Sequence, residues 1–202
     1  MNKIVKNAMI LTAITVISGF LLGLVYEVTK APIAQAKENA KVEAYREVLA
    51  DADEFTAYEG FDEGEASSVL RDSGISACTI NEVVVGTKNG ESVGCVITVT
   101  DSEGYGGEIQ FAVGIDNSGV IKGISFLSIA ESPGLGMNAK DDPTWKEQYY
   151  DKEVASFSVV KGASSSDSEV SALSGATISS KAITAGVNAA LCYYNSELGG
   201  AK

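Results

Sequence analysis

The chain has 202 residues, with 27 acidic and 15 basic side chains and a formal net charge of −12. It contains no histidine, and its three cysteines (Cys78, Cys95 and Cys192) form no C-x-x-C pair. This composition excludes histidine-based catalytic triads, histidine zinc sites, and iron–sulfur or four-thiolate zinc sites held by this chain alone, so no metal site is expected. The negative charge argues against binding to nucleic acid. The length suits one domain and a smaller segment.

The smaller segment is a predicted membrane anchor. Residues 7–26 are uncharged and mostly apolar, and a helix of this length spans about 30 Å, the thickness of a bilayer core. Lys3 and Lys6 precede the span, which predicts a cytoplasmic N-terminus. We therefore expect a cell-membrane anchor over residues 1–29 and an extracytoplasmic domain over residues 30–202. A cleaved signal peptide is the alternative, but its candidate cleavage site at 34–36 lies well beyond the apolar run.

Beyond the anchor, Pro32 is expected to break the helix or to open a new one. Apolar residues return at helical spacing over residues 33–49, which predicts a stalk that continues into a packed helix. The stretch from Glu43 to Asp72 holds 10 acidic and two basic residues, and we interpret it as solvated surface.

The rest of the chain predicts an antiparallel sheet between helices. Four extended runs follow one another, with Asn89-Gly90 as a hairpin signal between the first two; they cover residues 82–87, 93–99, 108–115 and 120–126. A fifth run is expected at 154–160, and a helix at 176–194 with Ile178 on its apolar side. A meander with flanking helices is an α+β fold. The sequence leaves open whether Cys78 and Cys95 form a disulfide or remain free thiols.

Two loops carry the candidate chemistry. Glu131-Ser132-Pro133-Gly134-Leu135-Gly136 has the glycines and proline of a tight turn whose amides can approach a ligand. Ser174-Gly175-Ala176-Thr177-Ile178-Ser179-Ser180 opens the last helix, with Ser174 as the predicted N-cap. A helix N-terminus suits a phosphate, because its first N–H groups are unpaired. Each loop also has a purely structural alternative: a plain turn for the first and a capped helix for the second.

Both loops resemble motifs of proteins that carry covalent FMN. Ser174-Gly175-Ala176-Thr177-x-x-Ser180 resembles their flavinylation motif, and the loop of residues 131–136 resembles their Glu-Thr-Pro-Gly-Leu-Gly segment, with Ser132 in place of threonine. Gly104-Tyr105-Gly106-Gly107 resembles a third family stretch. In this order, behind one anchor, the motifs make the chain similar to the G subunit of the Rnf complex, a membrane-bound ferredoxin:NAD oxidoreductase that pumps ions. It is nearly as similar to the C subunit of the sodium-pumping NADH:quinone reductase.

The resemblance implies an FMN-binding domain in which a phosphoester joins FMN to Thr177. It further implies an electron-transfer subunit with no complete activity alone. The expected partners are the other membrane, iron–sulfur and flavin subunits, and a separate flavin transferase that uses FAD and Mg²⁺. The residues expected around the cofactor are Thr177, Ser174, Gly175, Ala176, Ser180, Glu131, Ser132, Gly134, Leu135, Gly136 and Tyr105, with Trp145, Tyr149 and Tyr150 as further aromatic candidates.

Two other hypotheses remain open at the level of sequence. The first is a flavin shuttle that serves another external reductase, and the second is a membrane-anchored binding module without redox chemistry. Covalent flavin would exclude the binding module, and subunits that purify with the chain would exclude the shuttle.

Overall fold

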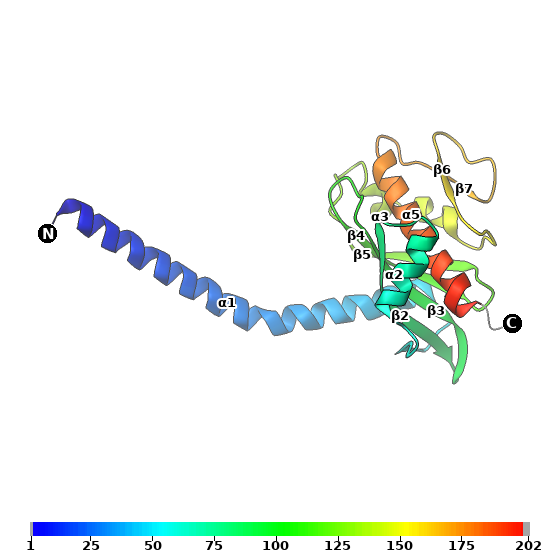
Figure 1. Cartoon of the computed structure of the whole chain (residues 1–202), viewed down its shortest axis with the longest axis horizontal. Coiled ribbons are helices and arrows are strands. Elements are labelled where there is room, and N and C mark those ends of the chain that lie inside the picture. The colour runs from blue at the N-terminus through cyan, green and yellow to red at the C-terminus, as the bar shows by residue number, and fades with distance from the viewer. Residues whose placement is uncertain (1, 200–202) are drawn as a thin grey trace. The chain divides into compact units, whose positions relative to one another are not determined.

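The computed structural model describes residues 2–199, which form two compact units that meet between Lys41 and Val42. The first unit is the greater part of helix α1 (Lys3–Val48). Within α1, an apolar stretch with a mean hydropathy of 2.4 and no buried side chain is long enough to cross a membrane. The expected break at Pro32 is wrong, because the ribbon of α1 is bent but unbroken (Figure 1). Alanine and lysine around Pro32 have high helix propensity, which offsets the one lost N–H donor.

The second unit is built on one antiparallel sheet with the strand order β1-β2-β3-β4-β5. Its strands are β1 (Glu54–Ala57), β2 (Cys78–Lys88), β3 (Glu91–Asp101), β4 (Ile109–Asp116) and β5 (Ile121–Ser128). Asn89 and Gly90 both have positive φ, 54° and 85°, as the predicted hairpin requires. The predicted α+β fold and its meander are therefore confirmed, with β1 as an additional edge strand.

Several short elements complete the unit. They are α2 (Glu63–Asp72), α3 (Asn138–Asp141), α4 (Pro143–Lys146), the 3₁₀ turn η1 (Glu147–Tyr149), β6 (Ser158–Val160), β7 (Glu169–Ser171), α5 (Thr177–Tyr193) and the π-helical turn η2 (Tyr194–Leu198). Strands β6 and β7 pair in parallel as a separate two-stranded sheet. Strand β1 and helix α2 lie inside the acidic stretch whose composition indicates only solvated surface.

Helices α5 and α2 cover one face of the large sheet and enclose the main core, to which Ile97, Phe111 and Val187 contribute. Gly186 lets α5 approach closely, since a Cβ there would lie 2.6 Å from the Phe111 ring. Burying this apolar surface supplies most of the free energy that favours folding. The packing fixes the start of α5 relative to the loops at the end of the sheet.

The opposite face of the sheet is covered by the last turns of α1. Tyr45, Val48 and Leu49 pack there against Val84, Val96 and Ala112. Gly114 and Gly123 pair across β4 and β5, and a Cβ at Gly114 would lie 2.1 Å from the Val48 carbonyl oxygen. Residues 42–48 are thus part of the second compact unit, which begins at Val42.

All three cysteines are free thiols, so the disulfide alternative is not realised. The Cys78 Sγ donates a hydrogen bond of 3.1 Å to Asp101 Oδ2, and burial raises the pKa of this thiol. Burial likewise raises the pKa of Cys95 to about 12. Neither thiol is a ready nucleophile at neutral pH.

Candidate functional site

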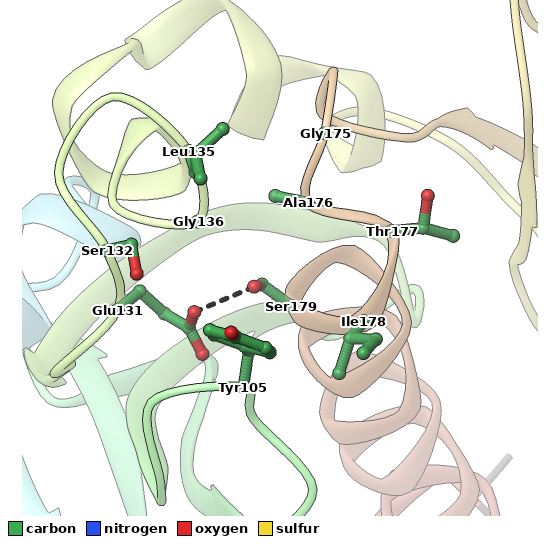
Figure 2. Close-up of a pocket in the computed structure, with 10 residues that line it drawn as sticks. All are labelled: Tyr105, Glu131, Ser132, Leu135, Gly136, Gly175, Ala176, Thr177, Ile178 and Ser179. Atoms are coloured by element: carbon green, nitrogen blue, oxygen red, sulfur yellow. Dashed lines mark hydrogen bonds between the residues drawn. The ribbon is translucent and has the colours of Figure 1, made fainter.

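A cavity of about 420 Å³ lies where three loops meet at the start of α5 (Figure 2). The loop after β3 contributes Tyr105, and the two loops singled out from the sequence contribute the remaining lining. The lining residues are Tyr105, Glu131, Ser132, Leu135, Gly136, Gly175, Ala176, Thr177, Ile178 and Ser179. The fold thus brings together three motifs that are separated by up to 72 positions in the sequence (105 to 177).

The first wall of the cavity is a turn over residues 132–135. The Leu135 N–H donates to the Ser132 carbonyl oxygen at 3.1 Å, and Gly134 has a φ of +74°. Proline second and glycine third, with positive φ at the glycine, are the marks of a type II turn. The turn directs Ser132 and Leu135 to the cavity, whereas Gly134 is not one of the lining residues and has open space around it. Gly134 is therefore explained by its backbone conformation.

The second wall is a turn over residues 173–176 that leads into α5. The Ala176 N–H donates to the Leu173 carbonyl oxygen at 3.0 Å, and Gly175 has a φ of +73°. The expected N-cap at Ser174 is wrong: the N-cap is Ala176, because the turn delays the start of the helix to Thr177. Ala176 has no side-chain oxygen to accept hydrogen bonds from the first turn of α5. The N–H groups of that turn remain available for an anion.

Four hydroxyl groups between residues 174 and 180 occupy different environments. Ser180 is fully buried, accepts from the Leu173 N–H and donates to the Ala176 carbonyl, both at 2.9 Å. Ser179 is buried and donates to Glu131 at 2.8 Å. Ser174 is exposed and is not one of the lining residues. Of these four groups, only the Thr177 hydroxyl both lines the cavity and has no hydrogen-bond partner among residues 2–199.

Glu131 forms the floor of the cavity and is only 4% exposed. One carboxylate oxygen accepts from the Ser179 hydroxyl, and the other accepts from the Gly106 N–H at 3.2 Å. Gly136 leaves the room for this arrangement, since a Cβ there would lie 2.5 Å from both the Glu131 carboxylate and the Ser179 oxygen. The floor is therefore fixed by contacts within the protein.

The rim of the cavity is apolar and open to solvent. Tyr105, Leu135 and Ile178 are 70%, 43% and 55% exposed, and within the described part of the second unit they are the exposed large hydrophobic side chains. Three such residues around one cavity indicate a ligand with an apolar surface.

The structure separates the expected site residues into two groups. The cavity is lined by Thr177, Gly175, Ala176, Glu131, Ser132, Leu135, Gly136 and Tyr105. It is not lined by Ser174, Gly134 or Ser180. Trp145, Tyr149 and Tyr150 lie elsewhere: Trp145 donates to the Ser171 carbonyl oxygen, and Tyr149 is bound to Thr184 in the core. Ile178 and Ser179 also line the cavity, although the motifs did not indicate them as ligand contacts.

A free hydroxyl beside an uncapped helix start, with an apolar rim opposite, suits a ligand that has a phosphate at one end and an aromatic ring at the other. FMN has both. Glycine at position 136 and the small residues 175–176 allow such a ligand to approach the backbone. The residues present therefore fit FMN, and residues 104–192 match the family model described as the FMN-binding domain. The chain thus combines an FMN-binding domain with an N-terminal helix that is long and apolar enough to cross a membrane.

Further comparisons place it in a family. Residues 1–48 match the RnfG N-terminal region. The chain is 35% identical to the G subunit of the Na(+)-translocating ferredoxin:NAD(+) oxidoreductase complex of Acetobacterium woodii, over 94% of this chain and 90% of that protein. It is 31% identical to the G subunit of the proton-translocating ferredoxin:NAD(+) oxidoreductase complex of Clostridium ljungdahlii, over 93% and 88%. The chain belongs to the family of G subunits of ion-translocating oxidoreductase complexes, which confirms the resemblance seen in the motifs.

A solved structure supports the fold. The crystal structure of the C subunit of the Na(+)-translocating NADH-quinone reductase from Parabacteroides distasonis superposes with a TM-score of 0.50 and 21% identity, covering 71% of this chain and 76% of that chain. Membership of the family makes the chain a component of an oxidoreductase complex, and the apolar part of α1 agrees with association with a membrane.

Proposed function

We propose that this chain is the electron-transferring subunit of an ion-translocating ferredoxin:NAD(+) oxidoreductase complex and carries FMN on Thr177 through a phosphoester. The observation that carries the proposal is the state of the Thr177 hydroxyl. It lies at the first residue of α5, lines the cavity and has no hydrogen-bond partner among residues 2–199. The neighbouring Ser179 and Ser180 hydroxyls are buried and already bonded.

The surrounding residues divide the work of holding FMN. The N–H groups at the start of α5 face the phosphate end, and Tyr105, Leu135 and Ile178 offer apolar surface to the ring. When bound, FMN supplies reversible electron transfer through its ring, and attachment through the phosphate leaves the ring free for that chemistry.

Attachment requires an enzyme other than this chain. Thr177 has no basic group bound to its hydroxyl, and the sequence has no histidine that could act as one. We assign the step to a flavin transferase that uses FAD and Mg²⁺. The Thr177 oxygen forms the bond to phosphorus and loses its proton, and AMP leaves as the pyrophosphate bond of FAD breaks.

The proposal also assigns the site to one side of the membrane. Lys3 and Lys6 hold the N-terminus in the cytoplasm, the apolar part of α1 spans the membrane, and the FMN domain lies on the outer side. A flavin without a covalent bond would be lost by diffusion there. The other membrane, iron–sulfur and flavin subunits of the complex are the partners that supply and accept electrons.

Mass spectrometry of the full chain, produced together with its flavin transferase, tests the proposal. The intact protein should be about 438 Da heavier than its sequence, the mass of FMN less water, and the added mass should map to residues 174–180. Thr177→Val keeps the β-branched shape and should abolish the adduct. The control Ser174→Ala removes the exposed hydroxyl of the same loop and should keep it. Covalent flavin at the normal level on Thr177→Val contradicts the proposal.

A further inference from the structure

Glu131 is a buried carboxylate whose charge has no cationic partner. It is 4% exposed, and within residues 2–199 no lysine or arginine forms a salt bridge with it. Its two oxygens accept from one amide and one hydroxyl, as an ionised carboxylate does. A buried charge without a counter-ion costs free energy of folding. A glutamine would have the same size without the charge, so the charge itself calls for an explanation.

The Glu131 carboxylate lies in the wall of the cavity. Figure 2 shows the carboxylate joined by a hydrogen bond to Ser179, in the wall of the cavity that Thr177 also lines. Gly136 clears the room for it, and Gly106 supplies the amide that fixes its second oxygen. Three segments thus hold one negative charge at a fixed place in the wall. Water screens this charge poorly, because the residue is buried.

We propose that the Glu131 carboxylate lowers the reduction potential of the flavin attached to Thr177. The inference rests on the proposed function. Each electron that enters the cavity without a proton adds negative charge next to Glu131, and two negative charges repel each other more strongly at a buried site than in water. The fixed carboxylate therefore opposes reduction. Ser179 and Gly106 are positioning residues that hold the carboxylate in the wall.

The test is a redox titration of the full chain, flavinylated and followed by the absorbance of the flavin. Glu131→Gln keeps the size of the side chain and removes the charge. It should raise the midpoint potential, so that the ratio of reduced to oxidised flavin at a fixed potential increases about tenfold, or about 30 mV for a two-electron couple. The adduct on Thr177 is verified by mass in every sample. Wild type without an adduct contradicts the proposed function, whereas an adduct with an unshifted potential in Glu131→Gln overturns only this inference.

Two controls separate charge from shape. Glu103→Gln removes an exposed charge from the Tyr105 loop and should leave the potential nearly unchanged, because solvent screens that charge. Ser179→Ala removes one hydrogen bond that positions Glu131 but keeps the charge, so stability should fall and the potential should shift less than in Glu131→Gln. A shift in either control equal to that of Glu131→Gln overturns the inference.

A further variant tests the idea if Glu131→Gln does not fold. Ser132 lines the cavity, is half-buried, and its side chain has no hydrogen-bond partner in the described chain. Ser132→Lys places a positive charge near the same wall and leaves both hydrogen bonds of Glu131 in place. It should raise the potential in the same direction, and an unchanged or lowered potential overturns the inference.

Discussion

Two turns of the same backbone type form opposite walls of the cavity, and they are stabilised in different ways. Each has glycine in its third position, Gly134 with a φ of +74° and Gly175 with a φ of +73°. The first turn is held from outside, by the Asn138 side chain that donates to the Gly134 carbonyl at 3.2 Å. The second is held from inside, by the buried Ser180 hydroxyl that binds both Leu173 and Ala176.

The difference shows what each turn contributes to the site. The first turn presents Leu135 to solvent and is followed by Gly136, which lies against the Glu131 floor. The second turn determines where α5 begins, and with it the position of Thr177. Distortion of the first turn should alter the fit of the flavin ring, whereas distortion of the second turn should displace the attachment point, Thr177.

The largest expected effect comes from removing the Ser180 hydroxyl, which supports the second turn from inside. Ser180→Ala leaves the buried Leu173 N–H without its acceptor, and an unsatisfied buried donor costs about 1–3 kcal/mol. Urea unfolding should show this loss, and the yield of covalent flavin should fall. Asn138→Ala is the matched control: it removes a partly exposed bond of the first turn and should cost about 0.5 kcal/mol or less, with normal flavinylation. Equal losses in the two variants would contradict the distinction between the turns.

The two glycines give a second, smaller test. Alanine in the left-handed region costs about 1–2 kcal/mol, so Gly134→Ala and Gly175→Ala should destabilise the protein to a similar extent. Only Gly175→Ala affects the cavity, because its Cβ would lie 3.0 Å from Leu135 Cδ2, whereas nothing lies within 4 Å at Gly134. The flavin absorbance should therefore shift in Gly175→Ala and stay unchanged in Gly134→Ala. A spectral shift in Gly134→Ala would show that this glycine contacts the flavin.

The sequence predicted most of the sheet and most of the cavity lining. Over β2 to β5, apolar residues either alternate with polar ones or form continuous runs, and clear turn residues separate the strands. Strand β1 and helix α2 were missed because their residues are largely acidic and exposed; α2 buries only Ala66 and Leu70. Too little apolar periodicity remained to indicate a packed helix there.

Two details of the site depended on tertiary structure. Helical periodicity placed Ile178 on the apolar side of the last helix, yet it is 55% exposed, because the first turn of α5 borders the cavity and not the sheet. The hydrogen bond between Glu131 and Ser179 joins residues 48 positions apart, and no local pattern reports such a contact. The sequence motif located Thr177, whereas the hydrogen-bond partners of Ser179 and Ser180 are evident only from the tertiary structure.

The smallest expected effect concerns the third segment of the cavity, which is anchored by Asp101 at the end of β3. Its Oδ1 accepts from the Glu103 N–H at 2.8 Å and so fixes the start of the loop that carries Tyr105. Burial raises the pKa of Asp101 above its ordinary value. The folded state therefore favours the protonated carboxyl, and the stability that this group contributes is present at acidic pH and is lost as the pH rises through the folded-state pKa. Asp101→Asn keeps an oxygen for the Glu103 N–H and cannot ionise.

The free energy of unfolding of Asp101→Asn should therefore increase relative to that of wild type as the pH rises from about 4 to 7. At the acidic end of this range the two proteins should differ little in stability. Denaturant unfolding at several pH values measures this gap directly, and comparing the two proteins cancels the titration of the other acidic residues. Asp101 is not one of the residues that line the cavity, so flavin content and absorbance should remain those of wild type. A gap that shrinks with rising pH would mean that the folded state favours the ionised carboxylate.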